Sequence, residues 1–537
     1  MTAFIHPLIG QVVGKEADKC TQFLGIKYAT LKDRFAAAEL VSHDGSGIDA
    51  TKYGPQVISP EQGVDIELGF IQQTLPKPDF PGISEIDGLN LNITVPGSVT
   101  VDTQPTKGLP VVVFIHGGGF NIGGNWWPQY DFARLVRLSA ELGKPMIGVG
   151  INYRVGALGF LTSPELRAAG YKPNNGLRDQ QTALRWIKEN VSGFGGNPED
   201  VTVMGQSAGA VSAGYLLLSE EKLARQLICL GGCPPLMGTL PMDAADQAAK
   251  SAIALLGLQD TSSTEMVERL LELPVHDLFA KMTSAVPFQP TVDGDIIPRP
   301  FTFDTFALET AQMKSRQWIE RVLLVYSKLD ASIMAYGGLL PRKSGIAAAF
   351  RASAVKSLQD HPEALASLLD QYALGTSTLT GTDDEALVNI LRLMSDISFF
   401  LPAVDFADKF TNKALVAAFN EPNPWAGLFK SHASHILDVA FLFQNFNASL
   451  DEGQRAIAVT FGGDVIAYVN GETPWQGKDR AGERGIGVYA DGKRRGPGEE
   501  GTQQEMHDRR VILGLARDAN GPGLDALVRV VTDFMSG

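Results

Sequence analysis

The sequence predicts an α/β protein in which helices flank a mostly parallel central sheet. Five apolar runs of strand length are mostly bounded by Gly, Pro or polar residues, which is typical of buried parallel strands. They lie at 111–115, 146–151, 201–204, 227–230 and 322–326. Helical stretches such as 176–190 and 208–219 lie between these runs. Strand followed by helix, repeated along a chain, predicts this layered class.

One continuous domain over residues 1–537 is the simplest organisation for this chain. No internal repeat, long charge run or low-complexity linker interrupts it, and Pro and Gly are scattered through turns. At roughly 240–320 and 340–430 the pattern turns helical, with Ala, Leu and charged residues at helical spacing. We interpret these two stretches as helical insertions that form lids over the sheet.

Composition and charge narrow the range of partners. Apolar residues make up 44% and charged residues 20%, which is ordinary for a folded globular protein. The formal net charge of −14 argues against nucleic acid and anionic lipid as partners. Three cysteines do not make a secreted disulfide framework, and we recognise neither a signal peptide nor an apolar run of about 18 residues. We therefore expect a cytoplasmic protein without a membrane span.

A serine lies where a strand is expected to turn sharply into a helix. The segment Gly205-Gln206-Ser207-Ala208-Gly209 joins an apolar run to an apolar helix, which is the arrangement of a nucleophile elbow. The backbone around such a serine packs closely, so residues with almost no side chain are needed two positions before and after it. A five-residue pattern also occurs by chance in long chains, so the surrounding sequence has to decide.

A glycine cluster follows the first of the predicted parallel strands. The run 111–115 leads into a His-Gly-Gly-Gly-Phe segment at 116–120, a pattern that directs backbone N–H groups at a developing oxyanion. We expect Gly118 and Gly119 to supply two such donors and Ala208 the third. A phosphate-binding loop is the alternative, but no Walker pattern or G-x-G-x-x-G follows a strand in this chain.

An activated serine needs a histidine base and a carboxylate that orients this base. In hydrolases with this elbow the acid and then the histidine follow the serine along the chain. Asp330, just after the run 322–326, is the natural acid, with a helix N-cap as its alternative role. His432 and His435 both precede an apolar helix, and spacing alone does not choose between them.

The chain resembles the type-B carboxylesterases, the cholinesterase-like group of α/β hydrolases, and most of all their fungal members. Besides the elbow, the matching segments cover nearly the whole length in order: FLGIKYA at 23–29, LNLNI at 89–93, NYRVG at 152–156, GFL at 159–161, NGLRDQ at 175–180 and FGGNP at 194–198. The family's acid position falls on Asp330. Its histidine begins an H-x-x-E/D stretch with a pair of phenylalanines behind it, which His435 and Asp438 match. The resemblance thus implies an α/β-hydrolase fold with His435, not His432, as the base.

Two departures from the family pattern affect the cellular compartment and the substrate that we expect for this protein. The family segment S-E-D-C-L-Y-L-N appears here at 84–92 without its cysteine, so the usual disulfides of secreted members are not expected. Gln206 stands where cholinesterases carry glutamate. A choline-like cation thereby loses one attractive carboxylate, which argues against cholinesterase activity.

Several residues are candidates for the wall of a substrate pocket. Trp126 and Trp127 follow the glycine cluster, Phe120 ends it, Gln206 precedes the serine, and Phe288 resembles a family position near the acyl pocket. For each of the aromatic side chains, burial in the core is the alternative.

Together these features predict a serine carboxylic-ester hydrolase. Ser207 attacks the ester carbonyl, His435 takes and returns the proton, and Asp330 orients His435. No metal or organic cofactor is required, and the expected substrate is a small, neutral, partly apolar ester. Acyl transfer to another nucleophile, or lactone processing in a biosynthetic pathway, is the alternative use of the same residues. A catalytically silent binding module is a further alternative, which the intact Ser207 and His435 disfavour.

Overall fold

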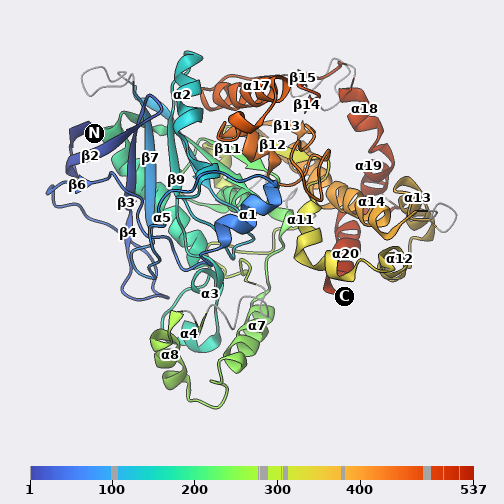
Figure 1. Cartoon of the computed structure of the whole chain (residues 1–537). Coiled ribbons are helices and arrows are strands. Elements are labelled where there is room, and N and C mark those ends of the chain that lie inside the picture. The colour runs from blue at the N-terminus through green and yellow to red at the C-terminus, as the bar shows by residue number, and fades with distance from the viewer. Residues whose placement is uncertain are drawn as a thin grey trace.

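The computed structural model describes residues 2–97, 107–275, 277–278, 288–303, 305, 313–375, 381–475, 485–499, 501–518 and 520–537. One mixed sheet runs through its centre (Figure 1). In spatial order its strands are β1 (Thr2–His6), β2 (Gly10–Ala17), β3 (Cys20–Lys27), β7 (Asn90–Pro96), β9 (Ile147–Ile151), β8 (Leu109–Ile115), β10 (Gly196–Gln206), β11 (Gln226–Leu230), β12 (Arg321–Ser327), β13 (Lys413–Phe419), β14 (Ile486–Ala490) and β15 (Lys493–Arg495). Three short strands lie beside this path: β6 (Ile48–Asp49), which pairs with β2, and the separate pair β4 (Ala29–Thr30) and β5 (Glu39–Leu40).

The sheet is parallel from β9 through β14 and antiparallel at its two ends. All five apolar runs predicted as parallel strands lie in this parallel part, in β8, β9, β10, β11 and β12. The mostly parallel central sheet expected from the sequence is therefore confirmed. The antiparallel strands at the N-terminal end and the strands β13 and β14 were not predicted.

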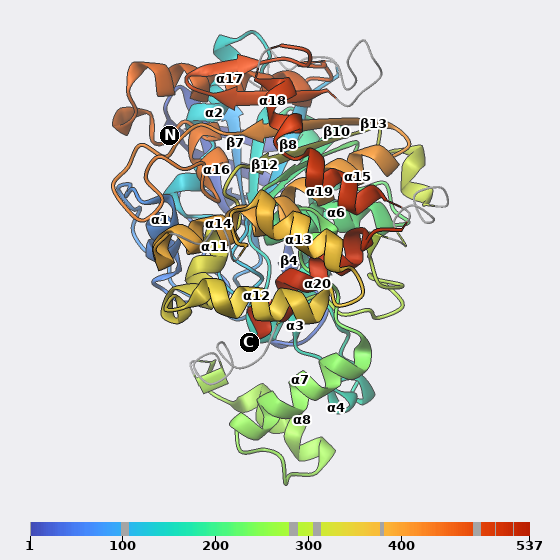
Figure 2. The same cartoon turned by 90° about the vertical axis from the view of Figure 1, so that its right-hand side faces the viewer.

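Helices cover both faces of the sheet and extend beyond it (Figures 1 and 2). In chain order they are α1 (Gly63–Ile71), α2 (Ala133–Glu141), α3 (Gly156–Phe160), α4 (Pro164–Ala168), α5 (Asn175–Asn190), α6 (Ala208–Tyr215), α7 (Met242–Leu255), α8 (Ser263–Glu272), α11 (Ser332–Met334), α12 (Ile346–Ser357), α13 (Pro362–Gln371), α14 (Asp383–Ser395), α15 (Leu401–Lys409), α16 (Leu437–Leu442), α17 (Glu452–Val469), α18 (Thr502–His507), α19 (Arg510–Arg517) and α20 (Gly523–Ser536). The predicted stretches 176–190 and 208–219 correspond to α5 and to α6 with the short turn after it.

Two apolar cores lie on opposite faces of the sheet because side chains alternate along each strand. In β8, Val111 and Val113 pack into one core with side chains of α5 and α6. Val112 and Phe114 point the other way, into a core shared with α2, α16 and α17. A strand buried on both faces has no polar side, so its sequence is one continuous apolar run.

The two predicted helical insertions are recognisable as helices between sheet strands. In the first, α7 and α8 project from one end of the molecule next to α4, as both views show (Figures 1 and 2). Residues 276, 279–287, 304 and 306–312 of that stretch lie outside the described residues. The second holds α12 to α15, with α12 packed against α14 and α20. This stretch ends earlier than predicted, because β13 (Lys413–Phe419) is a strand of the central sheet.

Among the described residues, one helical segment is long and apolar enough on average to cross a membrane, although charged residues interrupt it. The stretch Asp383–Lys409 joins α14, a π-helical turn and α15, with a mean hydropathy of 1.5 over its most apolar window. By length and composition alone it would cross a membrane, but 83% of that window is buried inside the protein. A helix that is apolar all round is expected in the core of a large protein.

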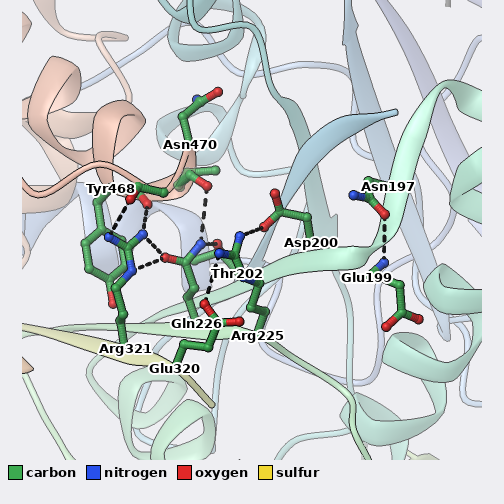
Figure 3. A network of polar contacts seen from close by, with 12 residues as sticks. Asn197, Glu199, Asp200, Thr202, Arg225, Gln226, Glu320, Arg321, Tyr468 and Asn470 are labelled. Atoms are coloured by element: carbon green, nitrogen blue, oxygen red, sulfur yellow. Dashed lines mark hydrogen bonds and ion pairs between the residues drawn. The ribbon is translucent and has the colours of Figure 1, made fainter. Parts of the chain in front are cut away.

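A network of polar contacts links three neighbouring strands of the sheet (Figure 3). Thr202, Gln226 and Arg321 are direct register partners on β10, β11 and β12. The Arg321 guanidinium donates to Gln226 Oε1 at 2.7 Å and lies 4.4 Å from the ring centroid of Tyr468. Beside it, Arg225 forms an ion pair of 2.9 Å with a glutamate and one of 2.8 Å with an aspartate.

Candidate active site

Ser207 lies in a strained turn at the carboxyl end of β10, directly before α6. Its backbone has φ 53° and ψ −122°, a conformation that residues other than glycine adopt rarely and at an energetic cost. A Cβ on Gly205 would lie 2.0 Å from the carbonyl oxygen of Gly209, and one on Gly209 would lie 2.1 Å from that of Ile115. The two flanking glycines are therefore required by backbone packing, which is the geometry expected of an elbow.

Asp330 and His435 come from two different strand ends and meet side by side. Asp330 follows β12 and His435 follows β13, and both side chains are buried. His435 Nδ1 and Asp330 Oδ1 are 2.9 Å apart, and the backbone N–H of Ser327 donates to Asp330 Oδ2 at 2.5 Å. The His435 backbone N–H donates to Ser332 Oγ at 2.9 Å. Asp330 is not a helix N-cap, because the residue that precedes α11 is Ala331.

The structure separates the two histidines that spacing alone left open. His435 lines the same cavity as Ser207, whereas His432 lines a different hollow at the surface, beside Arg392. The residue after His435 is Ile436, whose φ of 71° is unusual for a β-branched side chain. Local backbone strain thus occurs on both sides of this site, at Ser207 and at Ile436.

The ring nitrogen of His435 that points away from Asp330 is held by Gln206. His435 Nε2 and Gln206 Nε2 are 3.1 Å apart. With Nδ1 donating to the carboxylate of Asp330, Nε2 is an acceptor and the glutamine amide donates to it. Among the described contacts, Ser207 Oγ makes no hydrogen bond with His435. This contact with His435 was not foreseen from the sequence, which placed Gln206 next to the serine and among the candidates for the pocket wall.

The glycine loop after β8 lies against the same turn. Gly118 and Gly119 have φ values of 95° and 59°, and a Cβ on Gly118 would lie 2.2 Å from the carbonyl oxygen of Ile122. Gly118 and Gly119 line the cavity with Ser207. Ala208 is the first residue of α6, so its backbone N–H has no partner within that helix. All three predicted oxyanion donors are therefore close to the serine.

A cavity of about 440 Å³ opens at the carboxyl ends of the parallel strands, above Ser207 and His435. Ligand sites in open α/β sheets are expected at this edge. Its wall is mostly apolar and contains Ile66, Phe70, Ile122, Leu236, Met237, Ile333, Met334, Tyr336, Phe399 and Ile436. Its polar wall groups, besides those of the serine and the histidine, belong to Glu67, Asn121, Gln206 and the hydroxyl of Tyr336.

Of the residues predicted to line the pocket, Gln206 is part of the cavity wall. The four aromatic residues are buried and are not among the described wall residues: Phe120, Trp126, Trp127 and Phe288. Phe120 packs against Phe160 with ring centroids 4.8 Å apart, and Trp127 stacks on Tyr130 at 6.1 Å. The Trp126 indole donates to a buried glutamine at 2.7 Å, and Phe288 lies in the core. Large aromatic rings gain much from burial, which is the alternative role given above for these side chains.

Two further buried carboxyl groups lie around His435. Glu67 of α1 accepts hydrogen bonds on Oε1 from Gln129 Nε2, at 2.9 Å, and from the Tyr130 hydroxyl. Burial raises the pKa of Glu67, and these two donors oppose the rise. Burial, followed by the negative charge of Asp330, raises the pKa of Asp438 to about 7. The sequence pattern had singled out Asp438 but not Glu67, because no motif connects α1 with the elbow.

The described residues hold no group of three or more His, Cys, Asp or Glu side chains that is arranged to bind a metal ion. The three cysteines are free and buried. Burial raises the pKa of the Cys20 thiol to about 11 and that of Cys229 to about 12, which makes both poor nucleophiles.

The parallel sheet, the strained serine turn after β10, the acid after β12 and the histidine after β13 define an α/β hydrolase. The chain belongs to the Carboxylesterase family, whose model matches residues 2–470. The segment from β14 to α20 lies beyond that match.

Curated relatives match only part of the chain. Para-nitrobenzyl esterase of Bacillus subtilis is 34% identical over 303 residues, which are 54% of this chain and 56% of that protein. Lipase 4 of Diutina rugosa is 35% identical over 213 residues, or 37% of each chain. Acetylcholinesterase of Bungarus fasciatus is 35% identical over 291 residues, or 51% of this chain and 45% of the relative. The matches thus span between about a third and just over half of these relatives.

Solved structures resemble the whole fold. A PNB esterase superposes with a TM-score of 0.69 and 22% identity, covering 94% of this chain and 100% of the other. A carboxylesterase of Geobacillus stearothermophilus gives a TM-score of 0.72 at 22% identity and covers 95% of this chain and 100% of the other. At this identity the likeness establishes the fold, and the predicted α/β-hydrolase architecture is confirmed.

Proposed function

We propose that the protein is a serine carboxylic-ester hydrolase with Ser207 as nucleophile, His435 as base and Asp330 as the acid that orients it. The observation that carries this proposal is the 2.9 Å contact between His435 Nδ1 and Asp330 Oδ1, beside a serine on a strained turn. A buried carboxylate on Nδ1 holds that nitrogen protonated and leaves Nε2 free to accept a proton.

In the acylation step, Ser207 Oγ takes the place of the Gln206 amide at His435 Nε2 and attacks the ester carbonyl carbon. Hydrogen bonds of this kind are often loose before substrate binds and tighten in the complex. The proton of Oγ passes to Nε2, and the imidazolium is stabilised by Asp330. The same proton then goes to the leaving alcohol as the C–O bond breaks, which leaves an acyl group on Ser207.

Deacylation repeats the sequence with water in place of serine. His435 takes a proton from the water, hydroxide adds to the acyl carbon, and the proton returns to Ser207 Oγ as the carboxylic acid departs. In both steps the negative oxygen is stabilised by the backbone N–H groups of Gly118, Gly119 and Ala208. A preorganised donor of this type contributes about 2.7–4 kcal/mol to the transition state.

The substrate that this cavity suits best is a small, neutral, partly apolar ester. A volume of about 440 Å³ with mostly apolar walls accommodates a compact molecule and favours groups that gain from leaving water. The acidic formal net charge of −14 disfavours anionic substrates during encounter. Acyl transfer or lactone processing by the same residues would need an alcohol acceptor or an internal ester.

A direct test compares the wild-type protein with Ser207→Ala on short p-nitrophenyl esters. The variant should fold normally and lose turnover by at least about 10⁴-fold, because the nucleophile is gone. Product analysis with added alcohols separates the alternatives, since a transferase yields a new ester and a hydrolase yields free acid. Substantial turnover by a folded Ser207→Ala protein, or a silent wild type, would contradict the proposal.

A reducing, cytoplasmic location is a separate part of the proposal. It is supported by three free, buried cysteines within the described structure. The names of two curated relatives, a secreted lipase of Arthroderma benhamiae and a secreted triacylglycerol lipase of Gibberella zeae, point the other way. Cell fractionation with an antibody against this chain decides between the two compartments.

A further inference from the structure

The wall of the cavity contains an acidic side chain that the proposed mechanism does not use. Glu67 is 1% exposed and is the one Asp or Glu among the described wall residues. Both of its hydrogen bonds, from Gln129 and from Tyr130, end on Oε1. The described contacts give Oε2 no donor, although the side chain is almost completely removed from bulk water.

Two neutral acceptors on the same wall are also without protein donors. Asn121 uses its amide nitrogen to donate to the Gly119 carbonyl at 2.8 Å, while its Oδ1 is buried without a partner. Gln206 uses its amide nitrogen at His435, and its Oε1 is likewise buried without a partner. Both amide oxygens are enclosed, and that of Gln206 lies against the backbone of Gly117, which leaves the Glu67 carboxylate as the acceptor that a ligand in the cavity can reach.

Unpaired acceptors of this kind select what binds. A buried polar group without a partner costs free energy, and a ligand that supplies the missing donor recovers it. A site built to bond a substrate hydroxyl therefore discriminates strongly against the analogue that lacks it. Most of the remaining wall is apolar and penalises a charged group more than a neutral one. A neutral hydroxyl fits this combination better than an ammonium group.

We propose that the natural substrate is an apolar ester that carries a hydroxyl group, and that Glu67 accepts the hydrogen bond from this hydroxyl. The inference rests on the proposed esterase function and narrows its substrate class. Glu67 is then a specificity-determining residue, supplied from α1 and held in position by Gln129 and Tyr130.

The test measures kcat/KM in a pH-stat for matched esters. Hexyl acetate is compared with 6-hydroxyhexyl and 4-hydroxyhexyl acetate, and methyl heptanoate with methyl 7-hydroxyheptanoate, so that both sides of the ester bond are probed. We expect at least one hydroxylated ester to exceed its alkyl partner by on the order of 10- to 100-fold, the scale of a hydrogen bond to a charged group. A quaternary ammonium analogue, 6-(trimethylammonio)hexyl acetate, should be turned over more slowly than the hydroxylated ester.

Variants of Glu67 connect this preference with the residue. Glu67→Met removes the acceptor and should bring the hydroxylated and alkyl esters to within about threefold of each other. Glu67→Gln retains an oxygen for Gln129 and Tyr130 and should fold even if the methionine variant does not; we expect it to reduce the preference several-fold. The matched control is Glu421→Gln, since Glu421 is also buried but accepts from the Gly492 N–H at 3.0 Å, away from the cavity wall.

The outcomes separate this inference from the proposed function. Turnover of all the esters without any preference for a hydroxyl, or a preference that keeps its wild-type size in folded Glu67→Met or Glu67→Gln, overturns the assignment of Glu67 alone. A preference for the ammonium ester over the hydroxylated ester also overturns it, in favour of a cation site. Absence of turnover with every ester, in a folded wild-type protein, would instead end the esterase proposal itself.

Discussion

Replacing Asp330 by asparagine tests the orientation of the proposed base with almost no change in volume. The carboxylate uses two oxygens for two donors: Oδ1 faces His435 Nδ1 at 2.9 Å, and Oδ2 accepts from the Ser327 N–H at 2.5 Å. Asparagine has a single acceptor oxygen, so one of the two donors must face an NH₂ group. The backbone N–H of Ser327 cannot move its proton, whereas the imidazole can shift its own from Nδ1 to Nε2.

The competing arrangements differ in free energy by an amount that decides the outcome. Pointing the amide NH₂ at the buried Ser327 N–H costs about 1–3 kcal/mol for an unpaired donor, whereas the tautomer change avoids this cost. The asparagine oxygen should therefore stay with Ser327, and His435 should carry its proton on Nε2, where it cannot accept one from Ser207. We expect kcat/KM to fall by roughly 10⁴, or about 5.4 kcal/mol of transition-state stabilisation.

The assay follows hydrolysis of p-nitrophenyl butyrate by absorbance, with circular dichroism and thermal melting to establish that each variant is folded. The matched control is Asp438→Asn, because Asp438 is also fully buried beside the site but does not bond to His435 in the described contacts. We expect this control to lose less than about tenfold. A folded Asp330→Asn protein with more than about 1% of wild-type activity, or a 10⁴-fold loss in the control instead, would refute the assignment of the acid.

Three further predictions follow from the same geometry. His435→Ala should reduce kcat/KM as severely as loss of the serine. His432→Ala should reduce it by less than about threefold, because His432 lines a separate surface hollow. The reverse order would show that the base is wrongly assigned. Asp438 has a pKa raised from 3.8 to about 7, so the folded state binds its proton more tightly and wild-type stability should fall as pH rises from 5 to 8. In denaturant unfolding, the free energy of unfolding of Asp438→Asn should fall between pH 5 and 8 by roughly 2–3 kcal/mol less than that of the wild type. An identical fall in both proteins would contradict the raised pKa of Asp438. Gly205→Ala should abolish activity or folding, because its Cβ would lie 2.0 Å from a backbone oxygen. The control Gly514→Ala has open space in α19 and should stabilise the protein by about 0.5–1 kcal/mol. An active, stable Gly205→Ala would disprove the close packing of the backbone around the serine turn.

The fold could be predicted where burial leaves a strong mark on the sequence. Strands such as β8 and β12 are covered on both faces and therefore read as continuous apolar runs. β13 is buried too, but its sequence, KALVAAF, is rich in alanine, the residue with the highest helix propensity, so it was absorbed into a helical stretch. The first two strands, β1 and β2, are partly exposed and antiparallel, and β2 contains two glycines, which weakens any periodic pattern.

The site could be predicted where a motif fixes backbone geometry. Ser207 and its flanking glycines form a short segment whose sequence determines its turn, and the order of acid and histidine confined the search to a few residues. The cavity wall follows from tertiary packing instead. Glu67 and Tyr336 reach it from distant segments that no motif links to the serine, whereas Trp126 and Trp127 are near the glycine loop in sequence but point into the core.

The serine itself is tested most directly by a fluorophosphonate, which reacts rapidly only with an activated serine and requires no knowledge of the substrate. Peptide mapping of the labelled wild-type protein should place the adduct on Ser207. Labelling should be absent in Ser207→Ala and slowed by at least about 10³ in His435→Ala, because the base that activates the hydroxyl is missing. Rapid labelling at another serine, or no labelling of a folded wild-type protein, would contradict the assignment of Ser207 as the nucleophile.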